Sequence, residues 1–97
     1  MVITKCRAGA INIVDKKRCL VGIFTDGDLR RHLRENINIL SEPIKDIMTR
    51  NPVTITSESL VTEGLRILRD KKIDELPVVD KNKRPVGMLD IQDIISI

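Results

Sequence analysis

Two pairs of side chains in this sequence have the types and spacing to hold a hydroxylated ligand. Thr25 and Asp28 stand three residues apart after a β-rich run, and Asp90 and Asp93 repeat the spacing near the C-terminus. The same spacing is that of a helix capping box, in which the first side chain accepts from the backbone and the acid favours the helix N-terminus. Helix capping and ligand binding therefore both stay open for all four residues.

The charge around the first pair bears on the kind of ligand. A helix N-terminus attracts phosphate in general, but Asp26 and Asp28 both crowd this end of the expected helix. A phosphate would need basic residues nearby, and Arg30 or Lys45 are the candidates. Hydroxyl groups facing the acids fit the charges better, so the pattern favours a sugar, a nucleoside or a sugar nucleotide.

Both pairs belong to an internal repeat that a shift of 65 positions brings into register without gaps. Residues 14–16 fall on 79–81, residues 21–22 fall on 86–87, and Asp28 falls on Asp93. The identities lie at expected turns and helix starts, where backbone geometry limits the choice of residue. The repeat therefore predicts two copies of one structural unit.

The second copy is complete and predicts the element order β-α-β-β-α. Its strands are expected at 53–56, 76–79 and 85–89, the last two antiparallel, with a final helix from Asp90. Ser57 or Ser59 is expected to cap the helix between the first two strands. One face of that helix should be formed by four residues at helical spacing, with the glycine packed closely against a neighbouring backbone: Val61, Gly64, Leu65 and Leu68.

The first copy begins late, because residues 1–7 align with the end of the first helix of the second copy. We therefore expect a helix stub there, then strands at 10–14 and 20–25 and a helix at 26–35. Residues 41–48 predict a short capped helix with Pro43 in its first turn. The chain divides into a partial first unit at 1–40, and a linker helix with a complete second unit at 41–97.

The motifs in these units resemble a known family. Residues 46–49 followed by 51–55 resemble the entry to a CBS motif, and 76–80 with 86–89 resemble its strand pair. Residues 22–31, Gly-Ile-Phe-Thr-Asp-Gly-Asp-Leu-Arg-Arg, resemble the first CBS motif at the C-terminus of sugar-isomerase-type D-arabinose 5-phosphate isomerases. Those enzymes supply a precursor of the lipopolysaccharide sugar Kdo. The resemblance implies an α+β CBS-domain pair, or Bateman module, with a truncated first motif.

The resemblance also implies a regulatory, ligand-binding function. CBS pairs form two clefts between their motifs, commonly bind adenine nucleotides or related ligands, and often dimerise. In their Gly-x-x-Thr/Ser-x-x-Asp pattern, the Asp holds ribose hydroxyls and the Thr or Ser lies near ribose or phosphate. The first copy matches this pattern fully. In the second copy Asp90 replaces the Thr or Ser, which disfavours a phosphate there because a carboxylate repels it.

The expected ligand is an adenine nucleotide or a CMP-Kdo-like sugar nucleotide, and no cofactor is required. Residues 73–76 are expected either to present backbone groups to a base or to form a plain loop. Gly22 and Gly87 are interpreted as strand glycines that allow a bulge or a close approach. The candidate ligand-binding residues are Thr25, Asp28, Thr54, Pro77, Asp90 and Asp93.

The composition narrows the alternatives. The 17 basic and 14 acidic residues are interleaved and the chain has one aromatic residue of the Phe, Tyr and Trp type, so neither basic stretch, 30–34 or 81–84, predicts a nucleic-acid surface. Cys6, Cys19 and His32 do not make a zinc ligand set. No apolar run approaches the roughly 18 residues that span a bilayer. We expect a cytoplasmic protein that binds neither membrane nor nucleic acid.

Two functions remain in competition. The first is a regulatory module that controls an arabinose 5-phosphate isomerase whose isomerase domain lies elsewhere in a parent protein. The second is a ligand-free interaction domain, because a shortened first motif exposes apolar surface that a second copy could cover in a homodimer. Catalysis by this chain is not expected, since the sequence contains no Ser/His/Asp set, phosphate-binding loop or metal cluster.

Overall fold

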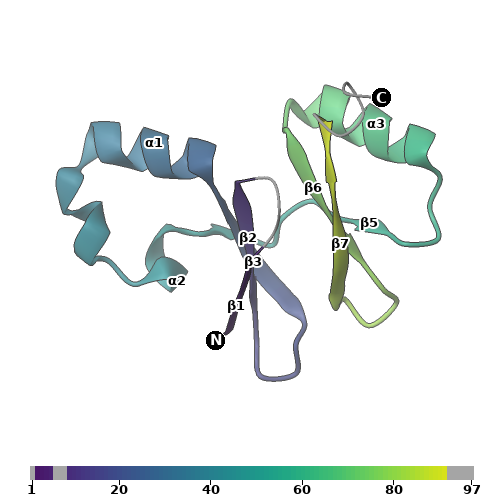
Figure 1. The fold of residues 1–97 in the computed structure, drawn as a ribbon, viewed down its shortest axis with the longest axis horizontal. Coiled ribbons are helices and arrows are strands. Elements are labelled where there is room, and N and C mark those ends of the chain that lie inside the picture. The colour runs from purple at the N-terminus through teal and green to yellow at the C-terminus, as the bar shows by residue number, and fades with distance from the viewer. Residues whose placement is uncertain (1, 6–8, 92–97) are drawn as a thin grey trace.

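Two small sheets stand side by side at the centre of the computed structural model, which describes residues 2–5 and 9–91 (Figure 1). One sheet has the strand order β1-β2-β3-β4 and the other β5-β6-β7. The strands are β1 Val2–Lys5, β2 Ala10–Val14, β3 Leu20–Thr25, β4 Thr49–Arg50, β5 Ile55–Thr56, β6 Glu75–Val79 and β7 Pro85–Asp90. The α-helices are α1 Asp26–Glu35, α2 Ile44–Ile47 and α3 Val61–Lys71, and a 3-10 helix covers Ile37–Ser41. The predicted α+β class is confirmed.

The first unit has the predicted strand pair and helix, but its beginning differs from the prediction. Residues 2–5 form the strand β1, not a helix stub, and β1 pairs antiparallel with β2 from Val2–Val14 to Lys5–Ile11. Val2, Ile3 and Thr4 are β-branched and favour strand over helix. In addition, β1 occupies the edge of β2 that β5 occupies on β6, so the segment pairs an edge that would otherwise be open.

The second unit packs α3 on its three-stranded sheet. Its core consists of Ile55, Leu68 and Leu76, surrounded by partly buried aliphatic residues from α3, β6 and β7. A Cβ atom on Gly64 would meet Cδ2 of Leu89, so this glycine is closely packed, but against the end of a side chain and not against the backbone that was predicted. Val61 is 63% exposed, and the predicted apolar face is therefore wrong at its first position, where the helix has only begun.

The N-termini of α3 and α2 also differ from the predictions. Leu60 is the N-cap of α3 and provides no side-chain hydrogen bond, because the Ser59 hydroxyl lies 2.9 Å from that of Thr56 instead. The linker helix is limited to α2. Pro43 is its N-cap residue, so it precedes the first turn, and no side chain caps this end of the helix. The chain then continues through the buried Met48, whose side chain fills the space beside Gly22.

The repeat with a shift of 65 positions is visible in the hydrogen bonds that an aspartate side chain accepts in each of the two hairpins. The Asp15 carboxylate accepts from the amides of residues 17 and 19, and the Asp80 carboxylate accepts from those of 82 and 84. The left-handed residues Arg18 and Lys83 are also equivalent, with φ of 69° and 63°. Both strand pairs shift register between equivalent residues, 13/14 and 78/79. Gly22 and Gly87 pair with residues 13 and 78, so both lie beside a bulge, as predicted for strand glycines.

Candidate functional site

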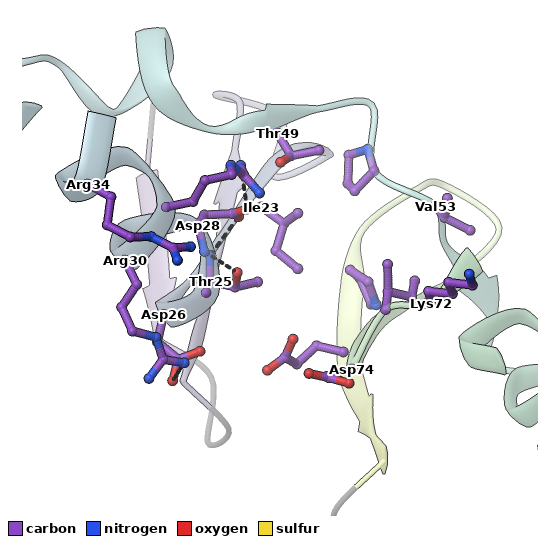
Figure 2. A pocket seen from close by; sticks show the side chains of 16 residues that line it. Ile23, Thr25, Asp26, Asp28, Arg30, Arg34, Thr49, Val53, Lys72 and Asp74 are labelled. Atoms are coloured by element: carbon purple, nitrogen blue, oxygen red, sulfur yellow. Dashed lines mark hydrogen bonds and ion pairs between the residues drawn. The ribbon is translucent and has the colours of Figure 1, made fainter. Parts of the chain in front are cut away.

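A cleft of about 430 Å³ opens where α1 and the end of β3 face the segment that leads into β6 (Figure 2). Its walls come from both units, so neither unit forms it alone. Of the six candidate ligand-binding residues, Thr25, Asp28 and Pro77 line it. The full lining is Ile23, Thr25, Asp26, Gly27, Asp28, Arg30, Arg31, Arg34, Thr49, Pro52, Val53, Lys72, Ile73, Asp74, Glu75 and Pro77.

Thr25 and Asp28 form a complete capping box at the start of α1. The Asp28 amide donates to the Thr25 hydroxyl, and the Thr25 amide donates to Oδ2 of Asp28, each over 3.0 Å. The guanidinium of Arg31 donates to the other carboxylate oxygen over 3.0 Å. The Asp28 side chain is 12% exposed, and each of its oxygens keeps acceptor capacity for a further donor. The predicted capping role is confirmed, and the ligand role stays a prediction.

Away from the N-terminus of α1, the cleft is lined by apolar side chains. Ile23 projects from β3, Pro52 and Val53 precede β5, and Ile73 and Pro77 belong to the segment that forms β6. Such surfaces suit a flat apolar group such as a base. Thr54 is half-buried, and it is not one of the described residues that line the cleft. The two residues before it, Pro52 and Val53, do line the cleft.

Charged residues are divided between the two walls. Figure 2 shows Asp26, Arg30 and Arg34 along α1, with Asp74 and Lys72 on the opposite wall. Arg30 pairs with Asp26 at 3.4 Å within α1, as Arg31 does with Asp28. Arg34 and Lys72 line the cleft without an ion pair inside the described part of the chain.

Glu75 adds an unusual carboxyl group to the wall opposite α1. Burial, followed by the negative charges of Asp90, Asp74, Asp26 and Asp28, raises the pKa of Glu75 from 4.5 to about 7. Glu75 pairs in register with Asp90 across β6 and β7, which explains why Asp90 contributes most among the charges. At neutral pH this carboxyl is therefore present in both its protonated and its ionised form, and the protonated form can donate a hydrogen bond.

The stretch 73–76, expected to present backbone groups to a base or to form a plain loop, contributes residues 73–75 to the lining and enters β6 at Glu75; its backbone role stays a prediction. Sequence reasoning did not identify the side chains of Glu75, Arg34, Lys72 or Thr49 as part of this site. For Glu75 a signal existed, because residues two apart in a strand share a face and Pro77 was already a candidate. Asp90 is buried at the end of β7, at the position equivalent to Thr25, and does not line this cleft. The final helix was expected to begin at Asp90, but Asp90 is the last residue of β7. The residues beyond 91, Asp93 among them, lie outside the described part of the chain.

Within residues 2–5 and 9–91, no cluster of three or more His, Cys, Asp and Glu side chains has the arrangement to hold a metal ion. None of the helices described here has the length and apolar character to cross a membrane.

Comparison with known proteins identifies the family. The model of the CBS domain matches residues 44–97, which are more than half of the chain. The chain belongs to the CBS-domain family. It is a CBS pair, because the CBS-domain pair of the protein MJ0100, in complex with 5′-methylthioadenosine and S-adenosyl-L-methionine, superposes on 91% of the chain with a TM-score of 0.80. The two sequences are 33% identical, and 68% of that structure is covered.

Two further relatives bear on function. The arabinose 5-phosphate isomerase KdsD of Pseudomonas aeruginosa is 41% identical over 95 residues, which cover 98% of this chain and 29% of that enzyme. The structure of CBSX2 in complex with AMP has 25% identity and a TM-score of 0.77, with 92% of this chain and 69% of that one covered. The chain thus spans less than a third of the isomerase that it matches, and corresponds to its C-terminal CBS region.

Proposed function

We propose that this CBS pair is the regulatory, ligand-binding module of an arabinose 5-phosphate isomerase, and that its ligand is a nucleotide or a sugar nucleotide. The isomerase domain would lie in a parent protein, and the site of action would be the cytoplasm. The identity of 41% with the isomerase KdsD supports the parent enzyme. The relatives that are described in complex with AMP or with S-adenosyl-L-methionine support the ligand class.

The observation that carries the proposal is the shared cleft. It joins the buried Asp28 and its neighbour Thr25 in the first unit to the apolar surface of Ile73 and Pro77 in the second. A carboxylate is a strong acceptor for two adjacent ribose hydroxyls, while the apolar walls bury a base. A ligand bound there contacts both units, so its binding energy favours one arrangement of the pair over others. Differential affinity of this kind is the basis of regulation.

A thermal-shift panel tests this function. It should contain AMP, ADP, ATP, CMP, S-adenosylmethionine, arabinose 5-phosphate and CMP-Kdo. A ligand at about 100 times its dissociation constant stabilises the folded state by about 2.7 kcal/mol, which raises the melting temperature by several degrees in a small domain. A shift that disappears in Asp28→Asn supports the proposal. Absence of any shift across the panel contradicts it.

The competing function is a ligand-free interaction domain that forms a homodimer. It is supported by two adjacent apolar side chains at the start of α3, Leu60 and Val61, which are 67% and 63% exposed. Apolar surface of this kind is a common feature of protein interfaces. Sedimentation of the chain at micromolar concentration, with and without the best ligand, separates the two functions. A dimer that no ligand stabilises supports the competing one.

Catalysis by this chain is not part of the proposal. In the proposed parent protein, the isomerase domain converts the sugar phosphate and the CBS pair modulates the rate. A turnover assay of this chain alone with arabinose 5-phosphate checks the assignment, and activity of the isolated chain would refute it.

A further inference from the structure

The cleft is lined by equal numbers of acidic and basic side chains, but only some of them are paired with each other. Four acidic side chains, Asp26, Asp28, Asp74 and Glu75, face four basic ones, Arg30, Arg31, Arg34 and Lys72. Asp26 and Asp28 already neutralise Arg30 and Arg31 within α1. The cations left without an ion pair in the described chain are Arg34 on α1 and Lys72 at the C-terminus of α3.

The unneutralised acids lie together on the wall opposite α1. Asp74 and Glu75 are adjacent where β6 begins, and Glu75 faces Asp90 across the strand pair. Arg34 lies less than two turns from Asp28 on the same helix. Its guanidinium can therefore donate hydrogen bonds to one phosphate of a ligand whose sugar is held by Asp28. Each further phosphate would add negative charge to a cleft whose opposite wall carries two acids, Asp74 and Glu75, against the single cation Lys72. In a partly desolvated cleft such repulsion weakens binding substantially.

From this arrangement we infer that the cleft takes a nucleotide with one phosphate and rejects the corresponding triphosphate, and that Asp74 and Glu75 are the residues that reject it. The inference rests on the proposed function and adds a substrate class to it. The ligands that the cleft should bind therefore include AMP, CMP and a sugar nucleotide in which one phosphate joins the sugar to the nucleoside. Hydroxyl groups of such a sugar can donate to the carboxyls that repel a second phosphate.

The selection should depend on pH, because the raised pKa of Glu75 places its titration near neutrality. The groups that face Glu75 are Asp26 and Asp28 from α1, Asp74 from its own segment and Asp90 from β7, with the α1 arginines on the far wall. Ionised Glu75 repels phosphate and protonated Glu75 does not. Discrimination against the triphosphate therefore grows as the pH rises from about 6 to about 8.

Isothermal titration of the 97-residue chain with AMP and with ATP tests the inference, in EDTA and again with Mg²⁺. We expect AMP to bind at least about tenfold more tightly than ATP. The ratio should shrink in Glu75→Gln and in Asp74→Asn, and Glu75→Gln should also lose its pH dependence. Glu63→Gln, on the exposed side of α3, is the matched control and should keep the ratio of the unaltered chain. A melting curve for each variant establishes that it is folded.

Several outcomes would overturn the inference. ATP binding as tight as AMP binding, in EDTA or as the Mg²⁺ complex, contradicts the selection itself. A ratio unchanged in both variants removes Asp74 and Glu75 from it. In these cases AMP still binds, and the proposed function stands. Failure of every nucleotide to bind overturns the proposed function, and the inference with it.

Discussion

Thr25 and Asp28 hold each other across the first turn of α1, each donating its amide to the side chain of the other over 3.0 Å. The carboxylate of Asp28 also accepts a hydrogen bond from the guanidinium of Arg31, one turn further along the helix. Asp28 is thus fixed in position before any ligand arrives, and it faces the cleft from a rigid support. Preorganisation of this kind lowers the entropic cost of binding.

Substitution of Asp28 separates its structural role from its ligand role. Asp28→Ala removes half of the capping box and the partner of Arg31, and should lower the free energy of unfolding by about 1–2 kcal/mol. Asp28→Asn keeps an acceptor for the Thr25 amide and should lose less stability, while nucleotide affinity falls in both variants. Urea denaturation beside titration calorimetry checks this. Equal affinity of Asp28→Asn and the unaltered chain would leave Asp28 a cap only.

The pH dependence of stability should report the environment of Glu75. Because its pKa is raised from 4.5 to about 7 in the folded chain, the folded state binds the proton more strongly than the unfolded state. This stabilisation is complete below pH 4.5 and is lost as the pH rises through about 7. Since the side chain is partly solvated, we expect a loss of only about 1 kcal/mol.

Glu75→Gln provides the check, because glutamine has no charge to bury. Denaturation of both proteins at about pH 5 and about pH 8 should show similar stability at the lower pH and greater stability of Glu75→Gln at the higher. An identical pH profile for the two proteins would mean that Glu75 titrates normally.

Two glycines offer a matched test of close packing. Gly64 lies in α3 against Leu89, whereas a Cβ atom on Gly27 in α1 would meet only the Thr25 hydroxyl, at 3.7 Å. Alanine ordinarily gains about 1 kcal/mol over glycine inside a helix, but Gly64→Ala should realise little or none of this gain, because the Leu89 methyl group must shift to admit the Cβ atom. Gly27→Ala should be neutral or raise it by up to about 0.5 kcal/mol. Thermal unfolding of both variants decides, and a Gly64→Ala variant stabilised by the full amount of about 1 kcal/mol would contradict the packing.

The second hairpin should lose stability in acid. The amides of Arg84 and Asn82 donate to the Asp80 carboxylate and hold its pKa below 3.8. Such a group stabilises the fold above that pKa, and the effect disappears as the pH falls through its folded value. Asp80→Ala should lower the melting temperature at neutral pH, with Lys16→Ala, the exposed residue at the position of the first hairpin equivalent to Lys81, as control. No difference between these variants would count against the role of the carboxylate.

The sequence was informative where a structure depends on neighbours in the chain. Thr25 and Asp28 cap a helix through contacts three residues apart, and the Asp15 and Asp80 turns are equally local, so repeat and spacing sufficed for both. The strand β1 was missed, because alignment with the second copy indicated a helix, while the open edge of β2 decided the conformation. Glu75 could have been inferred from its position two residues before Pro77 on one strand. Arg34 and Lys72 line the same cleft only because the two units pack together, and spacing in the sequence does not indicate that.

The most direct test of the central claim is an NMR titration of the ¹⁵N-labelled chain with AMP or CMP, following every backbone amide. We expect saturable shifts at residues of the cleft, above all Thr25, Asp28, Asp74 and Glu75, with the hairpin turns at Asp15 and Asp80 unaffected. Loss of those shifts in Asp28→Asn would complete the agreement. Shifts confined to surfaces away from the cleft, or none at millimolar nucleotide, would contradict a ligand-binding cleft between the two units.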